Sequence, residues 1–124
     1  MDEFMSYEDF LQIIKACDAS DPESCPIFTA LSTLQGKWKN HVLCELCKKD
    51  ILRFGELKKA LPSITNTMLT ATLRELETDG LVNRVQYNQI PPHVEYSLTD
   101  KGNDLRPIFY EIAKWGMKHP DESR

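Results

Sequence analysis

The sequence predicts one mainly α-helical domain that carries a small β-hairpin and has a helical extension at each end. Its length of 124 residues fits a single compact domain, which spans roughly 100–150 residues. Because 41% of the residues are hydrophobic and 27% are charged, the chain can bury a core, which excludes a disordered or collagen-like protein. Most apolar residues recur at helical spacing, and two β-like runs occur only in residues 81–98.

Two helices are expected in the N-terminal third. A capping-box pattern begins at Ser6 and apolar residues then recur on one face, so a first helix is predicted from Ser6 to Cys17. The polar residues 18–24 include a proline and are expected to form a loop. Pro26 suits the first position of a second helix, where an N–H has no helical partner, and this helix is expected to end near Gly36.

The middle of the chain predicts a long helix, a short helix and a tight turn. Apolar residues from Trp38 to Leu46 are spaced as on one face of a third helix. Residues 55–61 give about two helical turns, which Pro62 ends because it cannot continue the hydrogen-bond ladder. Thr65 is then positioned to cap a longer helix over residues 66–78.

The two faces of this longer helix differ in chemistry. Leu69, Leu73 and Leu76 follow the spacing of a buried stripe. The opposite face is uncharged apart from one arginine, and its residues are Asn66, Thr67, Thr70, Ala71 and Arg74. A helix face that avoids acidic residues over its first two turns suits contact with a polyanion, and an ordinary solvated surface is the alternative.

A hairpin and a last helix complete the predicted fold. Residues 81–87 and 93–98 form the two β-like runs around a tip at residues 88–92, which contains two prolines. Thr99 is expected to cap the last helix, and Pro107 is expected to bend it. The broad apolar face of this helix requires a partner.

The order helix, short helix, turn, longer helix and hairpin is that of a winged helix-turn-helix module, and it predicts DNA binding. In such a module the N-terminal half of the longer helix enters the major groove, and the hairpin, or wing, contacts a phosphate ridge or the minor groove. The residues expected to face bases and sugars are Thr65, Asn66, Thr67, Thr70 and Arg74. Those expected to contact phosphates are Lys37, Arg53, Lys58 and Lys59, and those of the wing are Asn88, Gln89 and His93.

The residues from about Cys25 to Trp115 contain a series of short motifs. They are Cys25-Pro26, Gly36-Lys37-Trp38, Phe54-Gly-Glu-Leu57, Met68-Leu69, Leu73-Arg-Glu-Leu76, Asp79-Gly-Leu81 and, most specific of all, Ile90-Pro-Pro-His-Val-Glu-Tyr-Ser-Leu-Thr99 followed by Gly102. This series resembles the HxlR-type winged-helix regulators of bacteria. The resemblance implies a homodimeric transcriptional regulator that dimerises through its terminal helices and often responds to redox-active or electrophilic compounds.

Three features depart from the pattern of that family. Its members commonly carry a basic residue at the position of Thr67 and an arginine or lysine at that of His93, so two contacts to DNA are weakened here. We therefore expect a lower or pH-sensitive affinity for DNA. The N-terminal segment through Ser24 is longer than usual, and it is expected to enlarge the dimer interface or to shield a cysteine.

Cys25 is the candidate redox sensor. The resemblance assigns this role to a cysteine beside the proline in several family members, and a thiol at a helix N-terminus ionises more readily because of the helix dipole. A buried structural thiol is the alternative. Cys44 and Cys47 lie inside a predicted helix near His41, where core packing is favoured over a zinc site or a CxxC redox motif, so no metal is expected.

Charge and targeting signals predict a cytoplasmic protein. The net charge of −4 is unevenly spread, because residues 1–24 hold seven acidic residues and one lysine, for −6, and the rest carries +2. The sequence has neither a secretory signal nor an apolar run that could span a bilayer, so no membrane association is expected. In the cytoplasm the four cysteines are expected to be reduced.

Three segments with separate tasks are therefore expected. Residues 25–98 form the winged helix-turn-helix DNA-binding domain, and residues 1–24 and 99–124 form the homodimer interface. The expected partners are a double-stranded DNA operator, a second copy of the chain, and an oxidant or small-molecule effector, without a cofactor. Catalytic motifs are missing, so an enzyme is not expected. The alternatives are a winged-helix module for protein contacts, which the negative net charge favours, and a thiol oxidoreductase.

Overall fold

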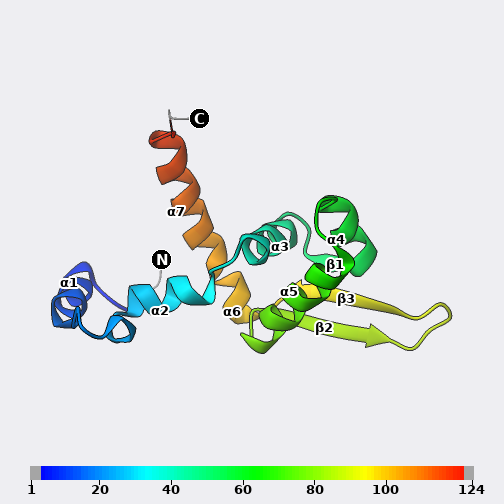
Figure 1. The fold of residues 1–124 in the computed structure, drawn as a ribbon, viewed down its shortest axis with the longest axis horizontal. Coiled ribbons are helices and arrows are strands. Elements are labelled where there is room, and N and C mark those ends of the chain that lie inside the picture. The colour runs from blue at the N-terminus through cyan, green and yellow to red at the C-terminus, as the bar shows by residue number, and fades with distance from the viewer. Residues whose placement is uncertain (1–3, 122–124) are drawn as a thin grey trace. The chain divides into compact units, whose positions relative to one another are not determined.

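A computed structural model describes residues 4–121 and divides the chain into two compact units, Met1–Gly36 and Lys37–Arg124. The outer ends of the two predicted terminal segments, residues 1–3 and 122–124, lie outside the described residues. The structure is mainly α-helical with a small antiparallel sheet, which confirms the predicted fold class (Figure 1). Along the described part of the chain, no helix is both long and apolar enough to cross a membrane.

The first unit contains two short helices joined by a loop. Helix α1 (Tyr7–Ala16) begins with the predicted capping box, in which Ser6 Oγ accepts a hydrogen bond from the Asp9 N–H at 3.1 Å and Asp9 Oδ2 accepts one from the Ser6 N–H at 3.2 Å. A single 3₁₀ turn, η1 (Pro22–Ser24), precedes helix α2 (Pro26–Thr33), which ends earlier than predicted. Within the described residues neither α helix has a buried side chain, so their apolar faces are left open.

The second unit has its core between three helices and a sheet. The helices are α3 (Lys37–Lys48), α4 (Phe54–Ala60) and α5 (Asn66–Thr78). The predicted stripe of α5 is confirmed, because Leu69, Leu73 and Leu76 are all buried. Each buried leucine stabilises the fold by roughly 1.5–3 kcal/mol, so this stripe determines which face of α5 remains outside.

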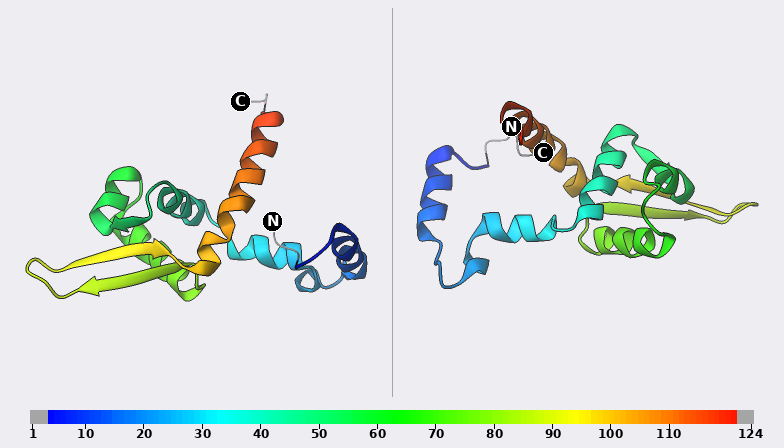
Figure 2. Two further views of the ribbon diagram at one scale, coloured as in Figure 1. Left: turned by 180° about the vertical axis from the view of Figure 1, so that it is seen from behind. Right: turned by 45° about the horizontal axis from the view of Figure 1, so that its top comes forward.

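The sheet of the second unit has three antiparallel strands in the order β1-β3-β2. Strands β2 (Val82–Tyr87) and β3 (His93–Leu98) form the predicted hairpin, and both views in Figure 2 show this ribbon reaching beyond the helices of its unit. The sequence does not predict β1 (Ile51–Arg53), which pairs with β3 and places Leu52 opposite Tyr96. The additional strand anchors one side of the wing to the core.

The C-terminal region corrects the prediction of one helix bent at Pro107. Two helices form instead, α6 (Asp100–Asn103), which Thr99 caps, and α7 (Leu105–Lys118). Pro107 has no N–H for the carbonyl of Asn103, and its ring would clash with that carbonyl in a regular helix, so the proline ends the first helix. Within α7 it lies in the first turn, where N–H groups have no helical partner in any case.

Candidate nucleic-acid interface

Helix α5 presents its N-terminal half to solvent. Thr65 is the N-cap, as predicted, and its Oγ1 accepts a hydrogen bond from the Met68 N–H at 3.0 Å. The helical period then places Asn66, Thr67, Thr70 and Arg74 on a flank of the helix beside the leucine stripe, and Thr65 directly precedes the first turn. The half-buried side chain among the five is that of Thr70. The four exposed ones are Thr65, Asn66, Thr67 and Arg74.

The acidic residues of α5 lie in its C-terminal half. Glu75 and the C-cap residue Asp79 are both bound by Lys39 of α3, whose Nζ lies 3.3 Å from Glu75 Oε2 and 3.0 Å from Asp79 Oδ2. Burial alone would lower the pKa of Lys39, but its hydrogen bonds to Asp79 and Glu75 outweigh burial and raise the pKa. The lysine therefore stays charged at neutral pH and partly offsets the negative charge of this half of α5, whose third acidic residue, Glu77, lines the pocket described next.

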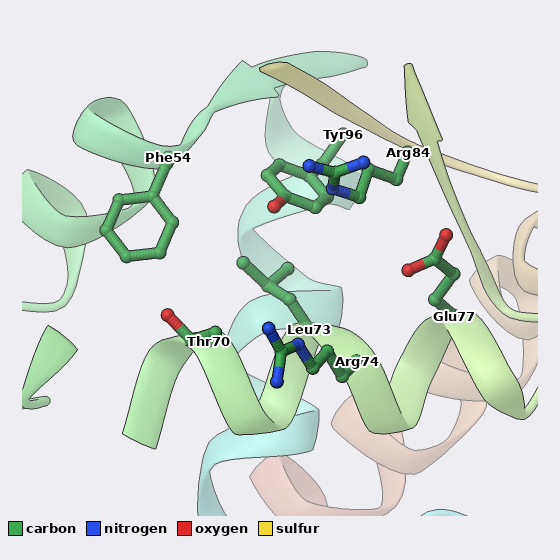
Figure 3. A pocket seen from close by; sticks show the side chains of 7 residues that line it. All are labelled: Phe54, Thr70, Leu73, Arg74, Glu77, Arg84 and Tyr96. Carbon is green, nitrogen blue, oxygen red and sulfur yellow. The ribbon is translucent and has the colours of Figure 1, made fainter. Parts of the chain in front are cut away.

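A pocket of about 310 Å³ lies between α5 and the sheet (Figure 3). The side chains that line it come from α4, α5, β2 and β3, and they are Phe54, Thr70, Leu73, Arg74, Glu77, Arg84 and Tyr96. Two guanidinium groups thus border the same hollow, Arg74 from the helix and Arg84 from the wing. Arginine forks suit phosphate oxygens. The sequence interpretation missed Arg84, although the alternation of strand residues was the signal that could have placed it on an exposed face.

The four predicted phosphate contacts come from three separate elements. Arg53 ends β1 and directly precedes Phe54, which lines the pocket beside α5. Lys58 and Lys59 lie in the last turn of α4, where Lys58 Nζ donates to the Pro62 carbonyl at 3.4 Å. Lys37 begins α3, and its ammonium lies 4.7 Å from the ring centre of Trp38. Arg53 is thus the neighbour in sequence of a residue that lines the pocket, and Lys37 lies at the start of another helix.

The predicted wing residues have two different environments. Asn88 and Gln89 are exposed in the loop between the two strands. His93 is half-buried, stacks on the Tyr87 ring with centroids 4.8 Å apart, and places its Nε2 3.3 Å from Glu95 Oε2. The loop residues are thus available to a duplex, whereas the imidazole already has an aromatic and a carboxylate partner.

Cys25 occupies the N-cap position of α2, directly before Pro26. Its sulfur accepts no capping hydrogen bond within the usual geometric limits. The neighbouring Phe28 amide nevertheless lowers the pKa of the Cys25 thiol, although partial burial acts in the opposite direction. The thiol of Cys17 and the Ile27 amide lower this pKa further. Cys25 is half-buried, so it is neither a fully enclosed structural thiol nor a freely exposed one.

Alkylation at neutral pH should distinguish Cys25 from Cys44. The thiolate is the reactive form, so a lowered pKa raises the reactive fraction of Cys25 at pH 7. Cys44 is the more exposed of the two, but burial around its sulfur and the nearby Cys47 raise its pKa. We expect iodoacetamide to modify Cys25 several-fold faster than Cys44, as followed by peptide mass spectrometry. Faster modification of Cys44 would contradict this assignment.

The side chains of His41, Cys44 and Cys47 are not gathered into one cluster in the described part of the chain. Within residues 4–121, no three His, Cys, Asp or Glu side chains gather as metal ligands would. Cys47 is half-buried on α3, and Cys44 and His41 are exposed on the same helix. A tetrahedral structural zinc site requires four ligands.

The fold and this surface define a class of protein. Three helices packed on a small sheet, with a helix whose exposed N-terminal half carries no acidic residue beside a two-stranded wing, form a winged helix-turn-helix module of the kind that transcriptional regulators use to bind DNA. The profile of the HxlR-like helix-turn-helix family matches residues 33–124, and the chain belongs to this family.

Individual relatives agree with the family assignment. The uncharacterized HTH-type transcriptional regulator YdzF of Bacillus subtilis is 47% identical over 95 residues, which are 77% of this chain and 87% of the relative. A structure described as a MarR-family transcriptional regulator from Porphyromonas gingivalis has a TM-score of 0.72 at 40% identity and covers 83% of this chain and 99% of that one. The redox regulator HypR in its oxidized form has a TM-score of 0.69 at 44% identity, over 78% and 99% of the two chains.

The chain is therefore a winged-helix transcriptional regulator, and its family implies DNA as the ligand. Its relatives are regulators and not enzymes. The family match begins at residue 33, so both cysteines of the first unit, Cys17 and Cys25, lie outside the matched range.

Proposed function

We propose that the protein reads a specific DNA operator as a homodimer and that an oxidant or electrophile controls this binding. The observation that carries the proposal is the exposed, acid-free N-terminal half of α5, capped by Thr65 and supported by the buried leucine stripe. Such a surface can approach base edges without repelling phosphates. A solvated face without this function would have no need to exclude acids.

The residues of α5 and its N-cap are proposed to recognise bases and to bind phosphate. The Asn66 amide suits a bidentate bond to adenine, and the hydroxyls of Thr65, Thr67 and Thr70 suit base edges or a thymine methyl group. Arg74 suits guanine or, together with Arg84 across the pocket, a phosphate. Residues outside α5 are proposed to position the duplex without reading its sequence. They are Lys37, Arg53, Lys58, Lys59, Asn88, Gln89 and His93.

A homodimer accounts for the open apolar faces of the terminal helices. In α7, Tyr110, Ile112 and Trp115 have exposed fractions of 63%, 54% and 68%. Apolar side chains of this size are seldom left uncovered together. We propose that residues 1–24 and 99–124 supply the interface and residues 25–98 the DNA-binding domain, so that two α5 helices lie about one duplex turn, roughly 34 Å, apart.

Control by an oxidant is proposed through Cys25. Support comes from its N-cap position, from the lowered pKa of its thiol and from the similarity to HypR, which is a redox regulator. Oxidation at this residue would act on the first unit, which contributes α1 to the proposed interface. A change there is expected to alter the spacing of the two α5 helices.

Selection from random duplexes, followed by binding at several salt concentrations, tests the function. We expect inverted repeats with half-sites about one turn apart, and an affinity that falls steeply between about 50 and 200 mM salt, because each phosphate contact releases counterions. The net charge of −4 favours a second candidate, a winged-helix module for protein contacts. Failure to enrich any sequence, with no salt-dependent binding to duplex DNA, would favour that candidate.

A further inference from the structure

The loop between α1 and α2 closes on itself beside two cysteines. At its neck the Asp18 N–H donates to Ser24 Oγ at 2.9 Å, and this hydroxyl lies 3.4 Å from the Asp18 carbonyl. Inside the loop the Asp21 N–H donates to the Asp18 carbonyl at 2.9 Å. Cys17 precedes the first neck residue and Cys25 follows the last, so the closed neck brings the two thiols together.

The contacts of Cys17 confirm this placement. Its sulfur lies 3.3 Å from the Ile13 carbonyl oxygen and 3.7 Å from that of Ser24, the residue directly before Cys25. The two sulfurs also lie close enough for each thiol to shift the pKa of the other. Both side chains are half-buried, and both lie within the same compact unit.

The two thiols have opposite acid strengths. The Phe28 amide, the Cys17 thiol and the Ile27 amide lower the pKa of Cys25. Burial raises the pKa of Cys17, and the adjacent Cys25 sulfur raises it further. The more acidic thiol, Cys25, can act as the nucleophile. The protonated thiol, Cys17, can then attack the oxidised Cys25 sulfur and displace a leaving group from it.

We infer that Cys17 and Cys25 of one chain are a redox pair, which a hydroperoxide oxidises to an intrachain disulfide. This inference names the residues through which the oxidant control proposed above would act, and the role of the pair in regulation rests on that proposed function. It assigns a role to Cys17, which the sequence interpretation treated only as the end of the first helix.

The reaction proceeds in two steps. The Cys25 thiolate attacks one peroxide oxygen, the O–O bond breaks, and the alkoxide leaves and takes a proton from water to become an alcohol. Cys25 is then a sulfenic acid. The Cys17 sulfur attacks the sulfenic sulfur, the S–S bond forms, and the S–O bond breaks with release of water that carries the Cys17 proton. In sum, two thiols and one hydroperoxide give one disulfide, one alcohol and one water.

Mass spectrometry of the full chain, treated with hydrogen peroxide and then blocked with an alkylating agent, tests the pair. We expect only two of the four cysteines to be alkylated, with an intact mass two hydrogens below that of a chain with two blocked and two free thiols. We also expect a cross-linked peptide that contains Cys17 and Cys25, and a monomer band on a non-reducing gel. The Cys17→Ser variant should stop at the sulfenic acid of Cys25, which dimedone traps, and Cys25→Ser should form no disulfide. The Cys44→Ser variant is the control and should behave as wild type.

Two outcomes would overturn the inference. One is a covalent dimer as the main product of the wild type, and the other is an unchanged oxidation product in Cys17→Ser. Neither readout involves DNA, so a chain that forms the disulfide yet binds no operator would contradict only the proposed function. Conversely, a chain that binds its operator but forms no Cys17–Cys25 disulfide after peroxide treatment would contradict only the redox pair.

Discussion

Replacing Gly102 by alanine is expected to lower the free energy of unfolding by about 3 kcal/mol. Gly102 is buried in α6, and an added Cβ would collide with the backbone carbonyl of Leu81 and lie 3.2 Å from Leu98 Cδ2. The carbonyl cannot move freely, because it accepts a hydrogen bond from the Thr99 N–H at 3.1 Å. The methyl group therefore displaces either α6 or the start of the wing. Urea unfolding followed by circular dichroism measures the loss.

Gly55 in α4 provides a matched control for this substitution. Among the described residues nothing lies within 4 Å of a Cβ built at this glycine, and it lies outside the proposed dimer interface. Alanine is favoured over glycine in a helix by up to about 1 kcal/mol, so Gly55→Ala is expected to leave stability unchanged or to raise it. A Gly102→Ala variant as stable as Gly55→Ala would show that α6 does not pack on Leu81.

Local signals in the sequence predicted most of the helices. The capping residues Ser6 and Thr65 and the leucine stripe of α5 act over three to seven residues, so the pattern contains the physical cause of the structure. Strand β1 was not predictable in this way. It has three residues, too few for a period, and it exists because β3, far along the chain, supplies its hydrogen bonds.

The candidate site likewise combines features that local sequence signals predict with features that only contacts in the folded chain create. The exposure of Thr65, Asn66, Thr67 and Arg74 follows from local sequence signals, whereas Thr70 is half-buried because it lines the pocket beside the sheet. Arg84 joins Arg74 only through the folding of the sheet against α5, and Cys17 meets Cys25 only through the hydrogen bonds at the neck of their loop. The partners of His93 also depend on a fold contact, because Tyr87 lies opposite it in the register of the hairpin.

Replacing Thr67 by glutamate is expected to reduce operator affinity by about 100-fold while leaving the fold intact. Thr67 is exposed in the first turn of α5, where a carboxylate interacts favourably with the helix dipole, so the free energy of unfolding should not fall. In the complex the same carboxylate would face the phosphates of the groove. Fluorescence anisotropy with the selected operator measures the affinity, and urea unfolding checks the fold.

Thr78→Glu and Thr67→Lys distinguish a contact from a change in net charge. Thr78 is exposed in the last turn of the same helix, so Thr78→Glu adds the same charge away from the proposed groove and should change affinity by about twofold or less. Thr67→Lys should raise affinity and steepen the dependence of log K on log salt by about 0.9, the value for one added phosphate contact. If Thr67→Glu and Thr78→Glu weaken binding equally, the N-terminal half of α5 does not enter the groove, because a contact depends on position and a net charge does not.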